Sequence, residues 1–389
     1  MTYISRAIEH VLKEYLSTFP VVALTGPRQS GKSTLIHHCC PQYTYVNFDD
    51  LAMVQRFHDD AEGFCQTYSG NTVFDEVQRV PELFLYIKRM VDADRNRYGR
   101  FVLTGSAQFT LNEKITESLA GRVGMLTLLP LQHSEIPQLT VSDLVLNGAY
   151  PELVARQYLG REAWYESYLS TYIERDVRSL IHVDSLSDFR KFVILLAARI
   201  GNLLDLSDLA KDIGTAPNTI KRWLSVLEAS YLVFRLVPYY ENLGKRMIKS
   251  PKIYFYDTGL VAHITGIRNQ DMLWNGPLAG ALYENFVIAE FLKANEHLKK
   301  RHKLFFARTS NGVEVDLIVD SGIMSKWFIE IKSSQTFKPE MLKNLKSFQV
   351  ETPDIQTMLI YRGNTVEQAP PRISVYKDID LLQKYTANP

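Results

Sequence analysis

The stretch VVALTGPRQSGKST, residues 21 to 34, decides the fold of the first part of this chain. Gly26 and Gly31, followed by Lys32 and Ser33, fill the pattern G-x-x-x-x-G-K-[ST] of a phosphate-binding loop. An apolar run precedes the loop and a helix-compatible run follows it, which separates the motif from a chance glycine-rich turn. Glycines let the backbone wrap around phosphate oxygens, and the following helix presents unpaired N–H groups to them. The stretch therefore predicts a nucleotide site.

The whole loop is expected to contact the nucleotide. Lys32 is expected to reach the β- and γ-phosphates and to act in catalysis, and Ser33 is expected to ligate Mg²⁺. The other expected nucleotide contacts in the loop are Gly26, Pro27, Arg28, Gln29, Ser30, Gly31 and Thr34.

A pair of acidic residues ends the next apolar run, NTVFDE, at Asp75 and Glu76. In P-loop ATPases an acidic residue at this place holds the magnesium shell, and the next one orients the attacking water. A solvated strand end would be the ordinary interpretation of such a pair alone. Because the pair follows a phosphate-binding loop, we expect Asp75 to hold Mg²⁺ and Glu76 to activate water.

The run RFVLTGS, residues 100 to 106, predicts a further strand that ends in polar side chains. Ligands collect at the C-terminal ends of parallel strands, so a polar residue there would lie beside the γ-phosphate. We expect Ser106, or alternatively Thr104, to sense the nucleotide. An ordinary turn is the competing interpretation.

Arg122 stands at the end of a predicted short helix, just before the last strand of the sheet. That position lies on the rim of the domain, where an arginine suits the nucleotide of a neighbouring subunit. An arginine finger is worth about 10³ to 10⁵ in rate. We therefore expect a homo-oligomer, in the form of a ring, with Arg122 acting in trans; a surface arginine that caps its own helix is the alternative.

The length and composition of the chain limit which domain numbers, partners and compartments are expected. A chain of 389 residues is too long for a single ordinary core and predicts several domains. Its net charge of +1 neither favours nor excludes a nucleic-acid partner, because a basic face can be balanced elsewhere. Three cysteines fit a reducing compartment, and no apolar segment is long enough to span a membrane, so we expect a cytoplasmic protein without a membrane partner.

The motifs also resemble those of a known family. The series GPRQSGKST, VFDEVQRVPELF, FVLTGSAQF, SLAGRVGMLTLLPL, GAYPELV and YIERDVR is similar to bacterial and archaeal AAA-type ATPases that carry a C-terminal domain of unknown function. The resemblance extends over essentially the whole chain. It implies an AAA+-like core, ATP as the ligand, a lid, a DNA-binding-like region and then a nuclease-like region.

Helical patterns replace strand patterns after residue 131. The run WYESYLSTYIERDVRSL places Arg175 and Arg178 one turn apart on a predicted helix. Lid helices of AAA+ ATPases often direct an arginine to the nucleotide. A helix face with salt bridges to Glu174 and Asp176 explains the same residues equally well.

A helix-turn-helix pattern follows in LSDLAKDIG, TAPN and TIKRWLSVLEASYLV, and two strand-like runs around ENLGKRMIK resemble a wing. Residues 189 to 252 hold 11 Lys or Arg and five Asp or Glu. Phosphate contacts of this kind give affinity without reading sequence. DNA is therefore an expected partner, although winged helices also serve as protein-binding modules. The expected DNA contacts are Lys221, Arg222, Lys245, Arg246 and Lys249.

Two alternating runs near the end, VEVDLIVD and KWFIEIKSS, place Glu314 with Asp316 and Glu330 with Lys332. A carboxylate on one strand and E-x-K on the next resembles the PD-(D/E)xK nucleases, in a D-x13-E-x-K spacing here. Asp316 and Glu330 would bind Mg²⁺ and Lys332 would orient the attacking water.

Glu284, on a predicted helix upstream, could complete this metal shell. The Pro-Asp that begins the nuclease pattern is replaced by Val315 and Asp316. Cleavage is therefore left open, because such a constellation can also be kept for binding.

Together these features predict an α/β protein with a P-loop AAA+-like parallel-sheet core, a helical lid, a winged-helix domain and a C-terminal α/β nuclease-like domain. The expected bounds are 1–135, 136–185, 186–262 and 263–389. The expected function is that of an ATP-hydrolysing motor that translocates along or remodels DNA, including branched DNA. The alternatives are a nucleotide-controlled regulatory or defence switch with a vestigial nuclease-like site, and a metal-dependent nuclease regulated by its ATPase.

Overall fold

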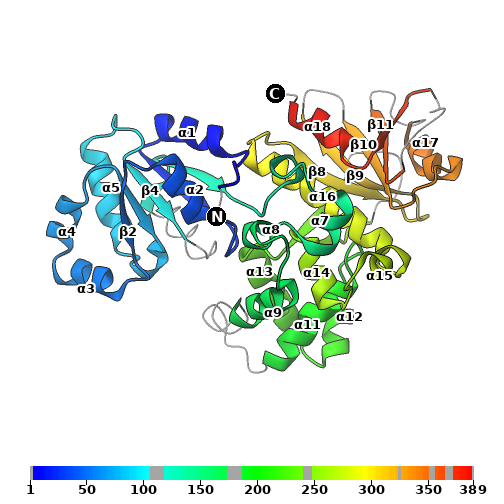
Figure 1. The fold of residues 1–389 in the computed structure, drawn as a ribbon, viewed down its shortest axis with the longest axis horizontal. Helices are drawn as coiled ribbons and strands as arrows, with labels where there is room; N and C mark the ends of the chain where they lie inside the picture. The colour runs from blue at the N-terminus through cyan, green and yellow to red at the C-terminus, as the bar shows by residue number, and fades with distance from the viewer. Residues whose placement is uncertain are drawn as a thin grey trace.

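The computed structural model describes residues 3–105, 118–172, 186–239, 248–322, 326–349, 355–363 and 371–387. Figure 1 shows one lobe built from the first part of the chain, in blue to cyan, beside a larger lobe built from the rest. Among the described residues, no helix combines the length and the apolar character that a membrane crossing requires.

A parallel sheet of five strands, in the order β2-β3-β4-β1-β5, forms the centre of the first lobe. Crossovers connect all of its strands, so their C-terminal ends share one edge of the sheet. The strands are β1 (Val21–Thr25), β2 (Thr44–Asn47), β3 (Thr72–Asp75), β4 (Phe101–Thr104) and β5 (Val123–Thr127).

Helices cover both faces of this sheet, and β1 is accordingly buried along its whole length. Side chains of α1 and α2 pack on one face, and side chains of α3, α4 and α5 pack on the other. These helices are α1 (Glu9–Thr18), α2 (Lys32–Cys39), α3 (Leu51–Asp59), α4 (Ala61–Thr67) and α5 (Leu83–Ala93). A 3-10 turn at Val77–Arg79 separates β3 from α5. The expected α/β fold with a parallel-sheet core is confirmed.

Helices follow the first sheet, as expected. They begin with a 3-10 turn at His133–Glu135 and continue with α7 (Val141–Asn147), α8 (Pro151–Ala155) and α9 (Arg161–Tyr172). Tyr165 of α9 and the backbone N–H of Ala149 both bond to Asp257, at 2.8 and 2.7 Å. Asp257 also caps α14 (Thr258–Ile264), so this carboxylate joins the helices after the first sheet to the region that follows.

The next region contains two short helices and an antiparallel strand pair. Asp205 caps α12 (Leu206–Ile213), Gly214 ends it with a left-handed φ of 83°, and α13 (Pro217–Ala229) follows the turn. Strands β6 (Val233–Pro238) and β7 (Lys252–Phe255) then pair antiparallel. The helices α11 (Leu186–Ala198), α14 (Thr258–Ile264) and α15 (Gln270–Asn275) flank this unit.

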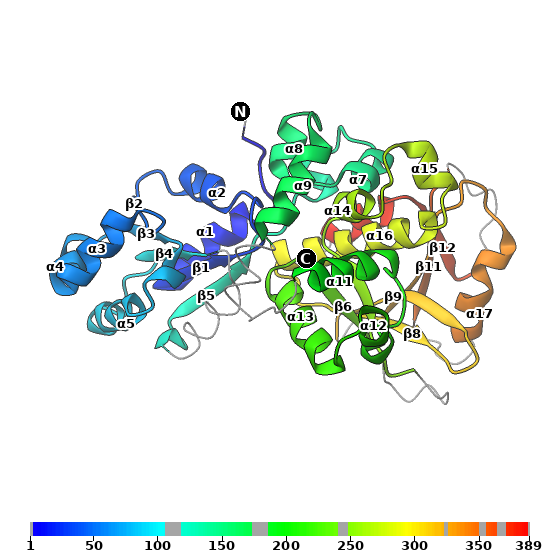
Figure 2. The same ribbon diagram turned by 90° about the horizontal axis from the view of Figure 1, so that it is seen from below.

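The last region is a mixed sheet of seven strands, in the order β12-β11-β10-β9-β8-β6-β7. The long helix α16 (Ala279–His297) packs on one face, and α17 (Lys343–Gln349) with the 3-10 turn Pro339–Leu342 packs on the other. The remaining elements are β8 (Lys303–Arg308), β9 (Glu314–Asp320), β10 (Trp327–Lys332), β11 (Gln356–Tyr361), β12 (Ile373–Lys377) and α18 (Asp380–Ala387). Figure 2 shows α16 and the sheet from a second direction.

Strands β6 and β7 thus belong to the same sheet as the C-terminal strands. One cluster of buried hydrophobic side chains also extends from Leu131 through α7, α8 and α9, the helix-turn-helix unit and α16 to this sheet. The expected domain boundary between residues 262 and 263 therefore stays a prediction. The packing of buried side chains is continuous across it.

A β-bulge in β9 changes which side chains share a face. Phe305 pairs with Ile318 but Ala307 pairs with Val315, so β9 contains one extra residue between them. Val315 consequently packs under α17, whereas Leu317 packs with α16. Simple alternation predicted both residues on one face, and the bulge is the reason that they separate.

Candidate functional site

The loop after β1 has a backbone that only glycine tolerates at its start. Gly26 has φ 143°, and a Cβ built there would lie 2.1 Å from the carbonyl oxygen of Leu128. Gly31 has φ 92° and forms the N-cap of α2. The loop is therefore held against the segment that follows β5, and its last residues open a helix of the kind that binds phosphate.

Lys32 is buried beneath this loop. Its Nζ donates to the carbonyl oxygens of Gly26 and Pro27, both at 2.9 Å. These two bonds hold the ammonium at the centre of the loop, where a phosphate would sit. The placement suits the phosphate-binding role predicted for Lys32.

Asp75, at the end of β3, accepts hydrogen bonds on both oxygens. Oδ2 accepts from Ser33 at 3.2 Å and from the hydroxyl of Tyr45. Oδ1 accepts from Thr104 and from the backbone N–H of Glu76, the latter at 3.1 Å. Burial, together with the bond to Asp75, raises the pKa of Tyr45 above its ordinary value, so its hydroxyl remains a donor. Ser33 and Asp75 thus meet as the sequence predicted, and Tyr45 is an addition from β2.

Glu76 follows Asp75 in a left-handed conformation, with φ 55° and ψ 41°. Residues other than glycine adopt this conformation at a cost, and such strain often accompanies functional sites. Gln78 donates a hydrogen bond to Oε2 of Glu76. The turn points the side chain of Glu76 into the cleft beside the loop.

The cleft has a volume of about 470 Å³ and lies between the first lobe and α9. Its floor contains Lys32, Ser33, Asp75 and Glu76 together with Arg28, Gln29, Gly31 and Thr34. Its other wall comes from four residues of α9, which sequence reasoning missed because their spacing equally fits a buried helix face: Trp164, Ser167, Tyr168 and Thr171.

A second hollow of about 330 Å³ adjoins the cleft and shares Gln29, Gly31 and Thr34 with it. Its lining is more apolar and combines the N-terminal segment with the start of the lid. The apolar contributors are Tyr3, Ile4, Leu131, Pro151 and Ala155. A largely apolar hollow beside a phosphate loop suits a nucleoside base.

Arg6 fixes the geometry of the loop from beneath. Its guanidinium donates to the carbonyl oxygens of Ser30 at 2.9 Å and Leu129 at 2.7 Å. It also lies 3.1 Å from Glu135, and both side chains are buried. No motif in the sequence marks Arg6, because its partners are distant backbone groups.

Arg122 lies at the opposite edge of the first sheet from this loop. Its backbone oxygen accepts from Val21, the first residue of β1, whereas the loop follows the last. Its guanidinium forms a two-pronged ion pair with Asp92, at 2.8 and 3.0 Å. Within one chain, Arg122 therefore stands away from the cleft.

Several predicted residues lie outside the described part of the chain: Ser106, Arg175, Arg178, Lys245 and Arg246. Lys221 and Arg222 are exposed on α13, and Lys249 is exposed before β7. Some of the charges counted in this region pair with one another. Arg199 pairs with Asp208 and Asp212, and Arg235 pairs with Glu228.

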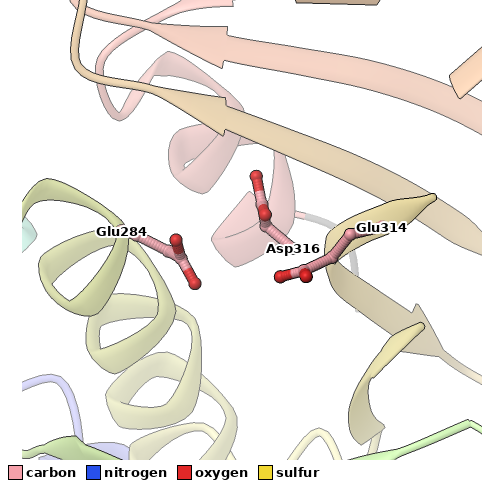
Figure 3. Close-up of side chains that lie close together, drawn as sticks. All are labelled: Glu284, Glu314 and Asp316. Carbon is pink, nitrogen blue, oxygen red and sulfur yellow. The ribbon is translucent and has the colours of Figure 1, made fainter. Parts of the chain in front are cut away.

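The second group of charged residues lies between α16 and the C-terminal sheet. Figure 3 shows Glu284 of α16 facing Glu314 and Asp316 of β9, with oxygen atoms of all three within 4.8 Å of one another. The pairing of β9 with β10 stops at Leu317 and Ile329. Beyond this point Asp316 accepts from the backbone N–H of Ile331 at 2.7 Å, so its carboxylate occupies the fork between the strands.

Glu330 and Lys332 border this fork. Lys332 lies 2.6 Å from Glu330 and 3.6 Å from Asp316. Burial, followed by repulsion from Asp316, raises the pKa of Glu330 to about 8. Among the described residues its buried Oε2 has no hydrogen-bond partner, and a bound cation would supply one.

Lys252 of β7 also enters the group. Its Nζ lies 2.9 Å from Glu284 and contacts Glu314. Burial lowers the pKa of this lysine, but attraction to Glu284, Asp316 and Glu314 outweighs burial and raises it overall. Tyr254 donates to Glu284 at 2.5 Å. Burial raises the pKa of Glu284, and Lys252 opposes that effect.

Oxygen donors of this kind suit Mg²⁺ at both places. In the first lobe Ser33 and Asp75 would hold it. In the C-terminal region Asp316 and Glu330 would do so, with the orphaned oxygen of Glu330 as the observation that favours a bound cation.

Three family models match the chain in succession. An AAA domain matches residues 18–137, one domain of unknown function (DUF8612) matches 138–271, and a second (DUF4143) matches 279–377. The first match agrees with the parallel sheet and with the phosphate-binding loop.

Relatives occur in bacteria and archaea. An uncharacterised protein of Mycobacterium tuberculosis is 32% identical over 356 residues, covering 90% of this chain and 78% of its own. An uncharacterised protein of Methanocaldococcus jannaschii is 22% identical, with 77% of this chain and 72% of its own covered. Among solved structures, the Walker-type ATPase of Pyrococcus abyssi is 15% identical, with a TM-score of 0.44 over 67% of this chain and 96% of its own. The chain therefore belongs to the family of the mycobacterial protein, and it joins an AAA-type P-loop ATPase domain to two domains of unknown function.

Proposed function

We propose that this protein is an ATP-hydrolysing AAA+-like motor that acts on DNA by translocation or remodelling. ATP with Mg²⁺ would occupy the cleft between the first lobe and α9. Lys32 would bind the β- and γ-phosphates, Ser33 and Asp75 would hold the metal shell, and Glu76 would position the attacking water. Thr104, which bonds to Asp75, stands where a sensor of the γ-phosphate is expected.

The observation that carries the proposal is a direct contact between the nucleotide loop and the helix-turn-helix region. The hydroxyl of Tyr231, two residues after α13, lies 2.8 Å from Oγ1 of Thr25, the residue before Gly26. Tyr231 is buried and has a left-handed φ of 56°. A change at the phosphate loop would therefore reach α13 through one hydrogen bond, as a motor requires.

A second connection runs through α16. His297 accepts from the backbone N–H of Leu129 at 3.0 Å, and Lys293 donates to the carbonyl oxygen of Leu131 at 3.0 Å. Leu129 also bonds to Arg6, which holds the phosphate loop. The same helix carries Glu284 about four turns away. The segment after β5 is thus tied to the C-terminal site by a single rigid helix.

DNA would be bound through phosphate contacts from exposed basic residues near α13. Lys221 and Arg222 are exposed on α13, the helix that corresponds to the groove-reading helix of winged-helix proteins, and Lys249 is exposed just before β7. Lys245 and Arg246, outside the described residues, are further expected phosphate contacts.

Hydrolysis would need a second subunit. Arg122 stands away from the cleft of its own chain and pairs with Asp92 there. In a ring, the guanidinium of Arg122 would leave Asp92 and approach the phosphates of the neighbouring subunit.

The decisive experiment measures ATP turnover with and without single-stranded, duplex and four-way DNA, together with the mass of the ATP-bound assembly. A motor acting on DNA is expected to turn over faster with at least one DNA and to assemble with ATP. Unchanged turnover with all three DNAs would contradict the DNA role, and full turnover by a monomer would contradict the trans arginine.

A metal-dependent nuclease in the C-terminal region is the second candidate, favoured by the fork geometry of Asp316 and the unpaired oxygen of Glu330. Asp316→Ala and Lys332→Ala are expected to abolish Mg²⁺-dependent cleavage while sparing ATP hydrolysis. Absence of cleavage of linear, flapped and branched DNA with Mg²⁺ or Mn²⁺ would remove this candidate.

A nucleotide-controlled regulatory or defence switch that binds a protein partner is the remaining alternative. Lys252, one of the basic residues counted in the DNA-binding-like region, is buried in the carboxylate group and cannot serve a nucleic acid. The switch predicts no DNA affinity, whereas phosphate contacts predict affinity that falls steeply with salt.

A further inference from the structure

Lys252 is a cation built into the C-terminal carboxylate group. Its side chain is 3% exposed, and its Nζ contacts both Glu284, at 2.9 Å, and Glu314. It also lies 5.6 Å from the ring centroid of Phe306 on β8. Lys252 belongs to β7, outside the helix and strands that carry the other charges, so the D-x13-E-x-K spacing contains no trace of it.

The ammonium group of Lys252 lies among the carboxylates where a divalent ion would otherwise bind. Oxygens of Glu284, Glu314 and Asp316 are close enough to share one ion, but two of these three carboxylates already contact Lys252. Mg²⁺ requires short, near-octahedral contacts to its oxygen ligands. A divalent ion at Glu284 and Glu314 would have to displace the buried Lys252. Lys332 also contacts Asp316 and Glu330, but its side chain is 36% exposed and it leaves Oε2 of Glu330 open to a cation.

The charges divide between two sides of the group. Asp316 and Glu330 with Lys332 leave one negative charge when both carboxylates are ionised. On the other side, Glu284 and Glu314 are balanced by Lys252 and by Arg308, which lies 3.2 Å from Glu314. A second divalent ion, as in two-metal phosphodiester chemistry, would find no uncompensated negative charge there.

We propose that the C-terminal group is a one-metal site in which Lys252 takes the place of a second divalent ion. The metal binds on the side of Asp316 and Glu330, while Glu284 and Glu314 hold the lysine. This inference rests on the metal-dependent site proposed above, and it removes Glu284 from the direct ligands. It also makes β7, a strand of the helix-turn-helix region, part of the site.

Mn²⁺ binding to the nucleotide-free full-length chain tests the inference, by calorimetry and by electron paramagnetic resonance. The wild type is expected to bind one Mn²⁺ that is lost in Asp316→Asn and retained in Glu284→Gln. Lys252→Met is expected to gain a second Mn²⁺, at least about tenfold tighter than any further ion of the wild type, because a buried positive charge is removed. The gain should disappear when Lys252→Met is combined with Glu284→Gln.

Lys303→Met is the matched control, since Lys303 is an exposed lysine on β8 of the same sheet. It should bind Mn²⁺ as the wild type does. The inference is overturned if Lys252→Met gains no ion, or if Glu284→Gln weakens wild-type binding as much as Asp316→Asn. Should Lys252→Met fail to fold, the comparison of Glu284→Gln with the wild type decides.

Failure of the proposed nuclease would look different. A wild type without an Asp316-dependent ion contradicts the metal-dependent site on the Asp316 side. An ion gained by Lys252→Met and lost with Glu284→Gln would still support the role of Lys252.

Discussion

Tyr45 and Asp75 are joined by a hydrogen bond between neighbouring strands of the first sheet, on the same carboxylate oxygen that accepts from Ser33. His37 stacks on the ring of Tyr45 at 4.3 Å and restrains it. Tyr45 therefore orients the carboxylate that is proposed to hold the magnesium shell. The sequence suggested Ser33 and Asp75 but gave no reason to connect them with Tyr45.

We expect Tyr45→Phe to lower kcat for ATP about tenfold while leaving nucleotide affinity within about threefold, because one hydrogen bond to a charged group is lost. The measurement is steady-state ATP hydrolysis over a range of Mg²⁺ concentrations, beside a binding titration. Tyr43→Phe is the control, since Tyr43 bonds to the backbone oxygen of Gly99 instead. Equal effects of the two substitutions would contradict the role of Tyr45.

Glu76→Gln separates binding from chemistry. The amide cannot accept a proton from water, so turnover should fall at least about 100-fold while ATP binding persists. Lys32→Ala, in contrast, should lose ATP binding. Glu82→Gln changes an exposed glutamate nearby and should behave as the wild type. Substantial hydrolysis by Glu76→Gln would show that another group positions the water.

Arg122→Ala is expected to reduce turnover by about 10³ at saturating ATP, with ATP binding retained. Arg95→Ala is a closely matched control, because Arg95 also pairs with Asp92, at 3.1 Å. Turnover of the wild type should rise with protein concentration as subunits associate. Unchanged turnover in Arg122→Ala would refute the arginine finger.

Alanine at both Lys221 and Arg222 should weaken DNA binding equally for all sequences. Two lost phosphate contacts should lower the slope of log affinity against log salt by about 1.8 for duplex DNA. Binding is measured by fluorescence anisotropy at several salt concentrations. Lys191→Ala, at an exposed lysine that pairs with Asp188, provides the comparison. An unaltered slope would place the DNA contacts elsewhere.

His297 predicts a pH dependence of stability. Burial, followed by repulsion from Arg6, Lys293 and Lys299, holds its pKa well below the ordinary value of 6.5. The unfolded chain therefore binds a proton that the folded chain excludes. The stability contributed by neutral His297 is present above about pH 6.5 and is lost as the pH falls below it.

His297→Gln should flatten this dependence, because glutamine can accept the bond from Leu129 without titrating. The difference from the wild type is at most about 1.4 kcal/mol per pH unit. Chemical denaturation between pH 5 and 8 measures it, with exposed His10→Gln as the control. An identical slope in His297→Gln and the wild type would contradict the prediction.

The first lobe was predictable because its signals are local. A phosphate-binding loop needs glycines and a lysine at fixed spacing between a strand and a helix, and each is visible in residues 21 to 34. Asp75 could be found because an acidic residue at the C-terminal end of a parallel strand lies at the same edge of the sheet as the phosphate-binding loop. The partners of these residues, Arg6, Tyr45 and the side chains of α9, could not be found, since they reach the cleft from distant segments.

In the C-terminal region, strand alternation correctly brought Glu314 and Asp316 together, but it did not foresee the bulge that sends Val315 and Leu317 to different sides of the sheet. A bulge depends on the pairing of two strands, and no residue in the sequence of β9 indicates it. Lys252 was counted with the basic residues of the helix-turn-helix region because its contacts with Glu284 and Glu314 also depend on how distant elements pack.

The sequence by itself determined the phosphate-binding loop, the succession of strands and helices in the first lobe, and which carboxylates the two proposed sites would use, because backbone conformation and residue chemistry depend on near neighbours. Only the tertiary structure decided that Tyr231 bonds to Thr25, that α16 ties the segment after β5 to Glu284, and that Lys252 pairs with Glu284 and Glu314. These contacts join residues far apart in the chain, and burial gives them their energetic weight by removing water that would otherwise screen the charges.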